Sequence, residues 1–340
     1  MKKFFTLILL SGSILFSSAQ NFDDAGVYMQ HIGQQQENIS KKFMSYASAS
    51  AHGKRARKVE NLRQKLLNEV QEARMNISGM PSFKGDKSYR DTAVNFMKLY
   101  FHILNDDYNK VLNLEEIAEQ SYDEMEALLM VKEVIDQKLQ EGNNRFILAQ
   151  KTFAASNNIN LIDSESELES KLKKVSALNK YYNEVYLLFF KPYMQDQNLV
   201  KDITKENITS IEQTRNALKQ YAEEGLEKLK SVKSFEGDNS VIGACRSMLQ
   251  FYVKEAGMVS GITDFVLAKE NFEKVKKDFE RSKKEKADVD AYNKAVNEMN
   301  AASSKFNQTI SEMNKQRTEN LNNWNKTVRQ FFDEHTPRYK

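Results

Sequence analysis

The sequence predicts an all-α protein made of two related, elongated antiparallel helical-bundle units. Glycine and proline, which punctuate strands and loops, are scarce: the 340 residues include 12 Gly and 3 Pro, against a usual combined share of roughly 12%. The long segments between them are rich in Ala, Leu, Lys, Glu, Gln and Met, which form helices readily. A short turn sequence, Ser-Phe-x-Gly-Asp, also occurs twice, each time between two helix-like segments.

The two turn sequences are related by a constant offset of 152 positions. Ten positions between 59 and 100 are identical to their partners at this offset, without a gap. A chance match between two amphipathic helices would reproduce the apolar rhythm but not a Gly-Asp turn at the same place. The sequence therefore predicts an internal duplication, with one unit over residues 20–160 and another over 161–340. The matching turn residues are Ser82, Phe83, Gly85 and Asp86 in the first unit and Ser234, Phe235, Gly237 and Asp238 in the second.

The repeated turn has two interpretations. As helix punctuation, its glycine adopts a backbone conformation that other residues avoid. Asp86 or Ser88 then caps the following helix by accepting from free N–H groups. As a binding loop, the same residues would instead contact a partner. A stop-and-restart signal is the commoner use of such residues, so the sequence favours a structural role.

Residues 1–19 have the layout of a secretory signal peptide. Lys2 and Lys3 form a basic start, residues 4–16 are apolar, and Ser17-Ser18-Ala19 places small residues at the −3 and −1 positions of a cleavage site. The apolar stretch is shorter than the roughly 20 residues of a membrane span, and no transmembrane segment is expected in the mature chain. We therefore expect an exported protein: periplasmic, on the cell surface or secreted.

Four helices are expected in the first unit. The first covers residues 22–51, and the second ends near Ile77 after a run of apolar residues at helical spacing. The third follows the turn and continues towards Glu119. The fourth opens at a capping box, Ser121-x-x-Glu124, and fades into the polar stretch 156–160.

The second unit repeats this plan with variations. Ser164–Glu167 caps its opening helix, in which residues 185–190 are apolar on every side and form the most interior segment. Pro192 is expected to kink or end that helix. Further helices cover about 205–232, the stretch from Ser240 towards the basic cluster 283–286, and a heptad-like seam from about 288 onwards. Cys245, the single cysteine, corresponds to Ala93 at the repeat offset and is expected in the core.

The sequence contains no motif that indicates catalysis. A di-iron bundle needs Glu-x-x-His pairs, and none of the histidines has a Glu three residues before it. No two of them share a helical face, which argues against zinc. Neither a phosphate-binding loop nor a Gly-x-Ser-x-Gly elbow occurs. We therefore expect a non-enzyme without catalytic residues, metal or cofactor. The histidines are His31, His52, His102 and His335.

The net charge of the chain gives no support for a nucleic-acid partner. The formal net charge is +3, and Lys2 and Lys3 of the leader supply two of these charges. Such a balance provides no electrostatic argument for nucleic-acid binding. The expected partner is a protein or another envelope component, and the oligomeric state stays open.

The signal peptide, the duplicated turn and the helical body together resemble a family of uncharacterised exported bacterial surface proteins. The resemblance implies a compartment but no activity and no functional residues. Three functional hypotheses are compatible with the sequence. The first is a non-enzymatic envelope or surface protein that presents helix faces to a partner. The second is a helical membrane-active or pore-forming protein, suggested by the aromatic run 181–190. The third is a small-ligand or metal-uptake binding protein with a site inside a bundle.

Overall fold

The structure is a computed structural model that describes residues 22–52, 55–107, 122–161 and 167–339. These residues form helices and no strand, which confirms the predicted all-α class. The elements, in chain order, are α1 (Ala25–Ala51), α2 (Ala56–Ser78), α3 (Ser88–His102), the π-helical segment η1 (Ile103–Asp107), α5 (Tyr122–Ser156), α6 (Glu167–Thr204), α7 (Ile208–Leu229), α8 (Ser240–Met258), α9 (Ser260–Arg281) and α10 (Lys286–His335).

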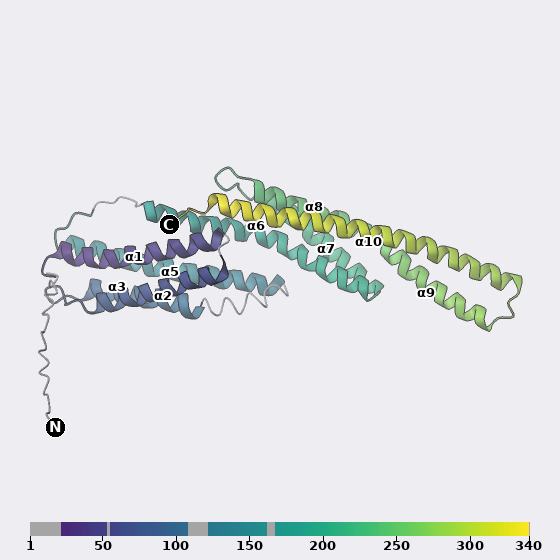
Figure 1. Ribbon diagram of the computed structural model, residues 1–340, viewed down its shortest axis with the longest axis horizontal. Helices are drawn as coiled ribbons and strands as arrows, with labels where there is room; N and C mark the ends of the chain where they lie inside the picture. The colour runs from purple at the N-terminus through teal and green to yellow at the C-terminus, as the bar shows by residue number, and fades with distance from the viewer. Residues whose placement is uncertain (1–21, 53–54, 108–121, 162–166, 340) are drawn as a thin grey trace, which may run out of the picture.

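The helices form two antiparallel bundles arranged end to end (Figure 1). Helices α1, α2, α3 and α5 make the first bundle, and α6, α7, α8 and α10 make the second. Helix α10 is 50 residues long, or about 75 Å at 1.5 Å per residue. The molecule is therefore elongated, as the sequence predicts. The internal duplication stays a prediction.

The core of the first bundle follows from helical periodicity. Buried residues recur at steps of three and four along each helix, so each helix turns one apolar stripe inwards. Burying these stripes against one another is what stabilises helices that would be marginal alone. The stripes comprise Tyr28, Ile32 and Ile39 in α1; Leu66, Val70, Ala73 and Ile77 in α2; Tyr89, Ala93 and Met97 in α3; and Phe146 and Phe153 in α5.

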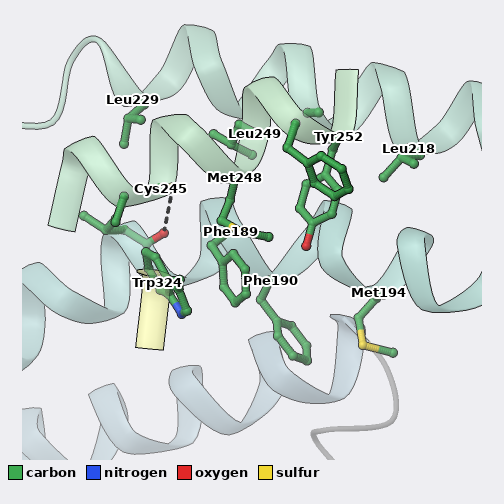
Figure 2. Packing of buried hydrophobic residues seen from close by; sticks show 14 of the residues in the cluster. Phe189, Phe190, Met194, Leu218, Leu229, Cys245, Met248, Leu249, Tyr252 and Trp324 are labelled. Carbon is green, nitrogen blue, oxygen red and sulfur yellow. Dashed lines mark hydrogen bonds between the residues drawn. The ribbon is translucent and has the colours of Figure 1, made fainter. Parts of the chain in front are cut away.

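The core of the second bundle is larger and contains the only tryptophan of the chain (Figure 2). Trp324 of α10 stacks on Phe189 of α6 with ring centroids 4.4 Å apart. Cys245 of α8 is fully buried and its thiol lies 3.9 Å from the carbonyl oxygen of Val185. Burial raises the pKa of this thiol to about 12. The expectation of a core cysteine is confirmed, as is the burial of its counterpart Ala93.

Two contacts tie the bundles together. Helix α5 contributes to both cores, with Met125 and Leu128 in the second and Phe146 and Phe153 in the first. The end of α10 reaches the end of α1, where an Asp333 oxygen lies 2.7 Å from Nδ1 of His52. The first unit is thus not an isolated body.

Of the two expected effects of Pro192, ending α6 is wrong, whereas a kink stays a prediction. The helix continues to Thr204, although proline cannot donate a hydrogen bond to the carbonyl of Leu188. A glycine of α7, Gly225, approaches closely at this point. A Cβ atom there would lie 3.4 Å from the Leu188 oxygen and 3.1 Å from Leu249. Helix α7 therefore packs closely on α6 at the point where proline removes a backbone hydrogen bond.

Two other expectations need correction. The helix from Ser240 does not run unbroken to the basic cluster, because Val259 separates α8 from α9. The apolar run 185–190 is not interior on every side. Val185, Phe189 and Phe190 are buried, whereas Tyr186, Leu187 and Leu188 are half-buried.

Helix α9 and the start of α10 extend beyond the second bundle as a two-helix hairpin (Figure 1). We call residues 267–303 the arm. Its two helices pack through a single seam, in which Phe279 stacks on Tyr292 with centroids 4.8 Å apart. At the base of the seam Phe265 stacks on Phe306 at 4.5 Å. Ala295 is the one residue of the arm that is buried.

Several predictions concern residues outside those that the structure describes. They are the signal peptide 1–19, the extension of the third helix towards Glu119, the box that begins at Ser121 and the cap that begins at Ser164. Among the described residues, no helix combines the length and the apolarity that crossing a membrane requires.

Candidate functional site

The repeated turns have the same backbone structure. In the first, the N–H groups of Phe83 and Asp86 each donate to the other residue's carbonyl, both at 2.9 Å. Phe235 and Asp238 do the same in the second, at 3.1 and 2.9 Å. The two residues between them have positive φ in both turns, 49° and 88° in the first and 50° and 89° in the second. This is the type I′ geometry, which requires a left-handed backbone at both central positions. The central pairs are Lys84-Gly85 and Glu236-Gly237.

Each turn also caps the helix that follows. Oδ1 of Asp86 accepts from the backbone N–H of Ser88 at 2.8 Å, and Oδ1 of Asp238 accepts from that of Ser240 at 2.7 Å. The hydrogen bonds from Ser88 lower the pKa of Asp86. For Asp238, partial burial raises the pKa, but bonds from Ser240 and His335 outweigh it and the net shift is downward. Both carboxylates therefore act as caps.

The phenylalanine of each turn packs into one bundle end. Phe83 contacts Tyr28 and Phe153, with centroids 5.3 and 5.1 Å away. Phe235 contacts Tyr181 and Phe331 at 5.5 and 5.7 Å. In both bundles the partners come from the first and the last helix. Ser82 is half-buried and Ser234 is exposed.

The structure does not bring the two turns together. The first lies beside the start of α1, where Tyr28 donates to the carbonyl of Pro81 at 2.9 Å. The second lies beside the end of α10, where Nε2 of His335 is 2.9 Å from Oδ2 of Asp238 (Figure 1). Glu236 is paired with Lys174 of α6 at 2.6 Å. The second turn is therefore joined to two more helices, whereas Asp86 and Lys84 are exposed.

One group of side chains near the second turn has metal-ligand chemistry. Atoms of Asp238, Glu334 and His335 lie within 4.8 Å of one another. Glu334 is exposed, and the hydrogen bond between His335 and Asp238 explains why these two lie close. The grouping needs no metal, and we assign none.

A charge cluster that the sequence reasoning missed lies in the core of the second bundle. It consists of Asp196 of α6, Glu255 of α8 and Arg317 of α10, and both carboxylates are 0% exposed. Nε of Arg317 donates to the two oxygens of Asp196 at 2.9 and 3.1 Å, and Nη2 lies 2.8 Å from Oδ1. Nη2 also donates to Oε1 of Glu255. One guanidinium thus serves two buried carboxylates.

The environment of Glu255 opposes its ionisation. Burial and the neighbouring Asp196 together raise its pKa to about 9, against the attraction of Arg317. The buried hydroxyl of Tyr252, three residues earlier on the same helix, also has its pKa raised, first by burial and then by the two acids. Both Oε2 of Glu255 and this hydroxyl are buried without a hydrogen-bond partner among the described residues.

A signal for this cluster was present in the sequence. Asp196 follows Phe189 and Pro192 on the buried stripe of α6, and Arg317 lies four residues after buried Met313. Glu255 lies between Tyr252 and Ala256 on the most apolar helix of the bundle. Three charges on apolar stripes indicate a buried network, because an unpaired charge there is strongly unfavourable. Only the fold shows that the three meet.

The first bundle carries an open groove of about 940 Å³ between α1, α3, α5 and the start of α6. Aromatic and aliphatic side chains line much of it, including Phe96, Tyr100 and Ile147, and burial raises the pKa of Tyr100. Amides such as Gln36, Asn143 and Gln150 contribute polar groups.

Comparison of the chain with protein-family models, with curated proteins and with solved structures gave no match. The candidate sites therefore rest on the geometry described above.

Proposed function

We propose that the protein is an exported, non-enzymatic envelope or surface protein that presents helix faces to a protein or another envelope component. The arm is the observation that carries this proposal. It projects from the second bundle, and beyond the ion pair of Lys269 with Glu206 at its start, its two helices pack mainly on each other (Figure 1). A helix that only completed a core would bury a full stripe along its length. Helix α9 has no buried residue after Val266.

The surface of the arm is mainly polar, which suits a partner that binds reversibly. Large exposed apolar residues are few there, with Leu267 52% and Val289 37% exposed. Charged side chains of both signs surround them. Interfaces of this composition depend on shape and charge pairing rather than on a large hydrophobic area.

The buried charge cluster supports a structural role more than a catalytic one. A catalytic acid or base must come within hydrogen-bond reach of its substrate. Asp196 and Glu255 are 0% exposed, and the side chain of Arg317 is 12% exposed. A substrate has no access to these carboxylates without opening the bundle.

Export is the second part of the proposal and rests on residues 1–19 and on the family resemblance. N-terminal sequencing of the protein purified from its own cells tests it. We expect a mature chain that begins at Gln20, or within one residue of it. A mature chain that begins at Met1 would remove the case for an extracytoplasmic role.

Position-specific photo-crosslinking in those cells tests the arm. A crosslinkable residue replaces exposed Lys277 or Asn300 on the arm, and matched controls replace exposed Lys65 or Gln71 on the first bundle. We expect both arm positions to capture the same partner, and unlabelled mature protein to compete for it. Capture that is equal at the controls, or absent from the arm, would contradict the proposal.

The groove of the first bundle favours small-ligand binding as a second function. Its volume and mixed lining fit a ligand with an apolar body and a few polar groups. Native mass spectrometry of the protein purified from its own cells would show a bound mass. Replacing Tyr100 with Ala should remove that mass while leaving the protein folded.

Membrane activity is the third proposal, and it has less support. The run 181–190 that suggested it contributes Tyr181, Val185, Phe189 and Phe190 to the core of the second bundle. Leakage of liposomes on addition of the mature protein would favour this function over the other two.

A further inference from the structure

The charge cluster lies inside the second bundle, on the two helices that lead into the arm. Glu255 is four residues before Val259, where α8 gives way to α9. Arg317 is four residues after Met313, a buried residue of α10. Asp196 holds Arg317 from α6 on the opposite side. The cluster therefore joins α8 and α10 to α6 within the bundle, several helical turns from the base of the arm at Phe265 and Phe306.

The hydrogen bonds of the cluster leave one carboxylate oxygen without a donor. Nε and Nη2 of Arg317 serve Asp196 and one oxygen of Glu255, while Nη1 donates to Oδ1 of Asn314 at 2.7 Å. Gln197 donates to Oδ2 of Asp196 at 3.3 Å. The remaining oxygen, Oε2 of Glu255, is buried and unpartnered among the described residues. Two carboxylates against one guanidinium would also leave a net buried negative charge.

We propose that the charge cluster is a proton-dependent clamp between α8 and α10, the helices that lead into the arm: the folded protein holds one proton on Glu255, and losing it loosens the contact between these helices inside the second bundle. A protonated Glu255 removes the excess charge and makes the buried carboxyl a hydrogen-bond donor. This inference does not depend on whether the arm has a partner.

The charged and titratable groups around Glu255 come from all the helices of the cluster. Asp196 and Tyr193 belong to α6, Arg317 to α10 and Tyr252 to α8 itself. Arg317 is the one cation among them, and its strongest attractive interaction is with Asp196. The second acid therefore gains less from Arg317 than it loses by burial beside Asp196.

The direction of the pH dependence follows from linkage. The pKa of Glu255 is raised in the folded protein, from an ordinary value of 4.5 to about 9. Between those values the folded state binds one proton more than the unfolded state. The stabilisation that this extra proton gives the folded state is fully present below pH 4.5. It decreases as the pH rises from 4.5 to about 9 and is lost above that. One proton corresponds to a roughly tenfold change in the unfolding equilibrium constant per pH unit.

Chemical denaturation of the full mature protein from pH 6 to 8.5 tests the proton. The variants are Glu255→Gln, which mimics the neutral carboxyl, and Glu319→Gln, a control at an exposed position two residues beyond Arg317. We expect the ratio of unfolding constants, wild type over Glu255→Gln, to rise about tenfold per pH unit. The ratio of wild type over Glu319→Gln should stay constant.

Hydrogen exchange at pH 6 and 8.5 tests the clamp. Protection factors, which correct for the chemical rate of exchange, should fall in residues 252–266 of the wild type at the higher pH. They should stay constant there in Glu255→Gln. A flat ratio of unfolding constants overturns the proposal, and so does a Glu255→Gln variant that does not fold. Unchanged protection in 252–266 overturns the role of the proton as a clamp.

Discussion

The two bundles share a plan but differ in what their turns and cores are attached to. In each, a type I′ turn caps a helix with an aspartate and inserts a phenylalanine between the first and last helices. In the second bundle, the turn is also bound to His335 and Lys174, the core contains a charge cluster, and two of the helices continue into the arm. The same turn therefore caps a helix in both bundles, and in the second it also binds side chains of α6 and α10.

The largest expected effect is a difference in stability loss between arginine variants in the cores of the two bundles. Arg317→Met leaves Asp196 and Glu255 buried without a cation and should reduce the free energy of unfolding by about 3–5 kcal/mol. The comparison in the first bundle is Arg63, a buried arginine that is 7% exposed and donates to the carbonyl of Leu104 at 3.2 Å. Arg63→Met should cost about 1–3 kcal/mol, because its carboxylate partner Glu60 is solvated. Denaturant titrations that give equal losses would contradict the difference.

The next effect concerns the buried phenylalanine that both turns contain. Phe83→Ala opens a cavity between two aromatic rings and Phe235→Ala one among three, including that of His335. Each should cost about 3 kcal/mol, the lower end for a buried phenylalanine. The lower end is appropriate because both residues lie at the end of a bundle. Thermal melts of the two variants check this. Losses that differ strongly between them would break the structural equivalence of the turns.

A smaller loss is expected from the backbone of the turns. Gly85→Val and Gly237→Val place a β-branched residue at φ of 88° and 89°, where side chains are strained. Each should cost about 1–3 kcal/mol. Space is not the cause, because a Cβ atom at either glycine meets nothing within 4 Å. Gly→Ala variants should therefore show the same direction with a smaller loss.

The smallest effect distinguishes the two caps. Asp86→Ala and Asp238→Ala should each cost about 0.5–2 kcal/mol through the lost cap. Asp238→Ala should lie nearer the upper limit, because it also removes the contact with His335. In a protein that already carries His335→Ala, the losses of stability caused by Asp238→Ala and Asp86→Ala should be more nearly equal. If the Asp variants melt normally but lose a partner found by crosslinking, the turn is a recognition loop instead.

Local chemistry explains which features could be predicted from sequence. The helices follow from apolar spacing, and the turns from glycine and aspartate at fixed offsets, because these signals act over a few residues. The sequence left open whether Pro192 kinks or ends α6, because the choice depends on packing against other helices, such as the close approach of Gly225.

The charge cluster and the arm depend on contacts between distant residues. Asp196 and Arg317 are separated by 121 positions, and nothing local to either identifies the other. The helices of the arm have an ordinary heptad-like pattern, so the sequence did not distinguish a projecting hairpin from a core helix. Its exposure became evident only from the fold, in which the arm helices pack mainly on each other.

Hydrogen exchange along α8, α9 and α10 at a single neutral pH tests most directly whether the arm is a separate, weakly held element. The amides of residues 241–256 should exchange only when the bundle opens, because their helix is packed on three others. The amides of 268–281 and 287–300 should exchange through local opening of the hairpin, on the order of 100-fold faster or more. Equal protection in α8 and in the arm would contradict the distinction between the two regions.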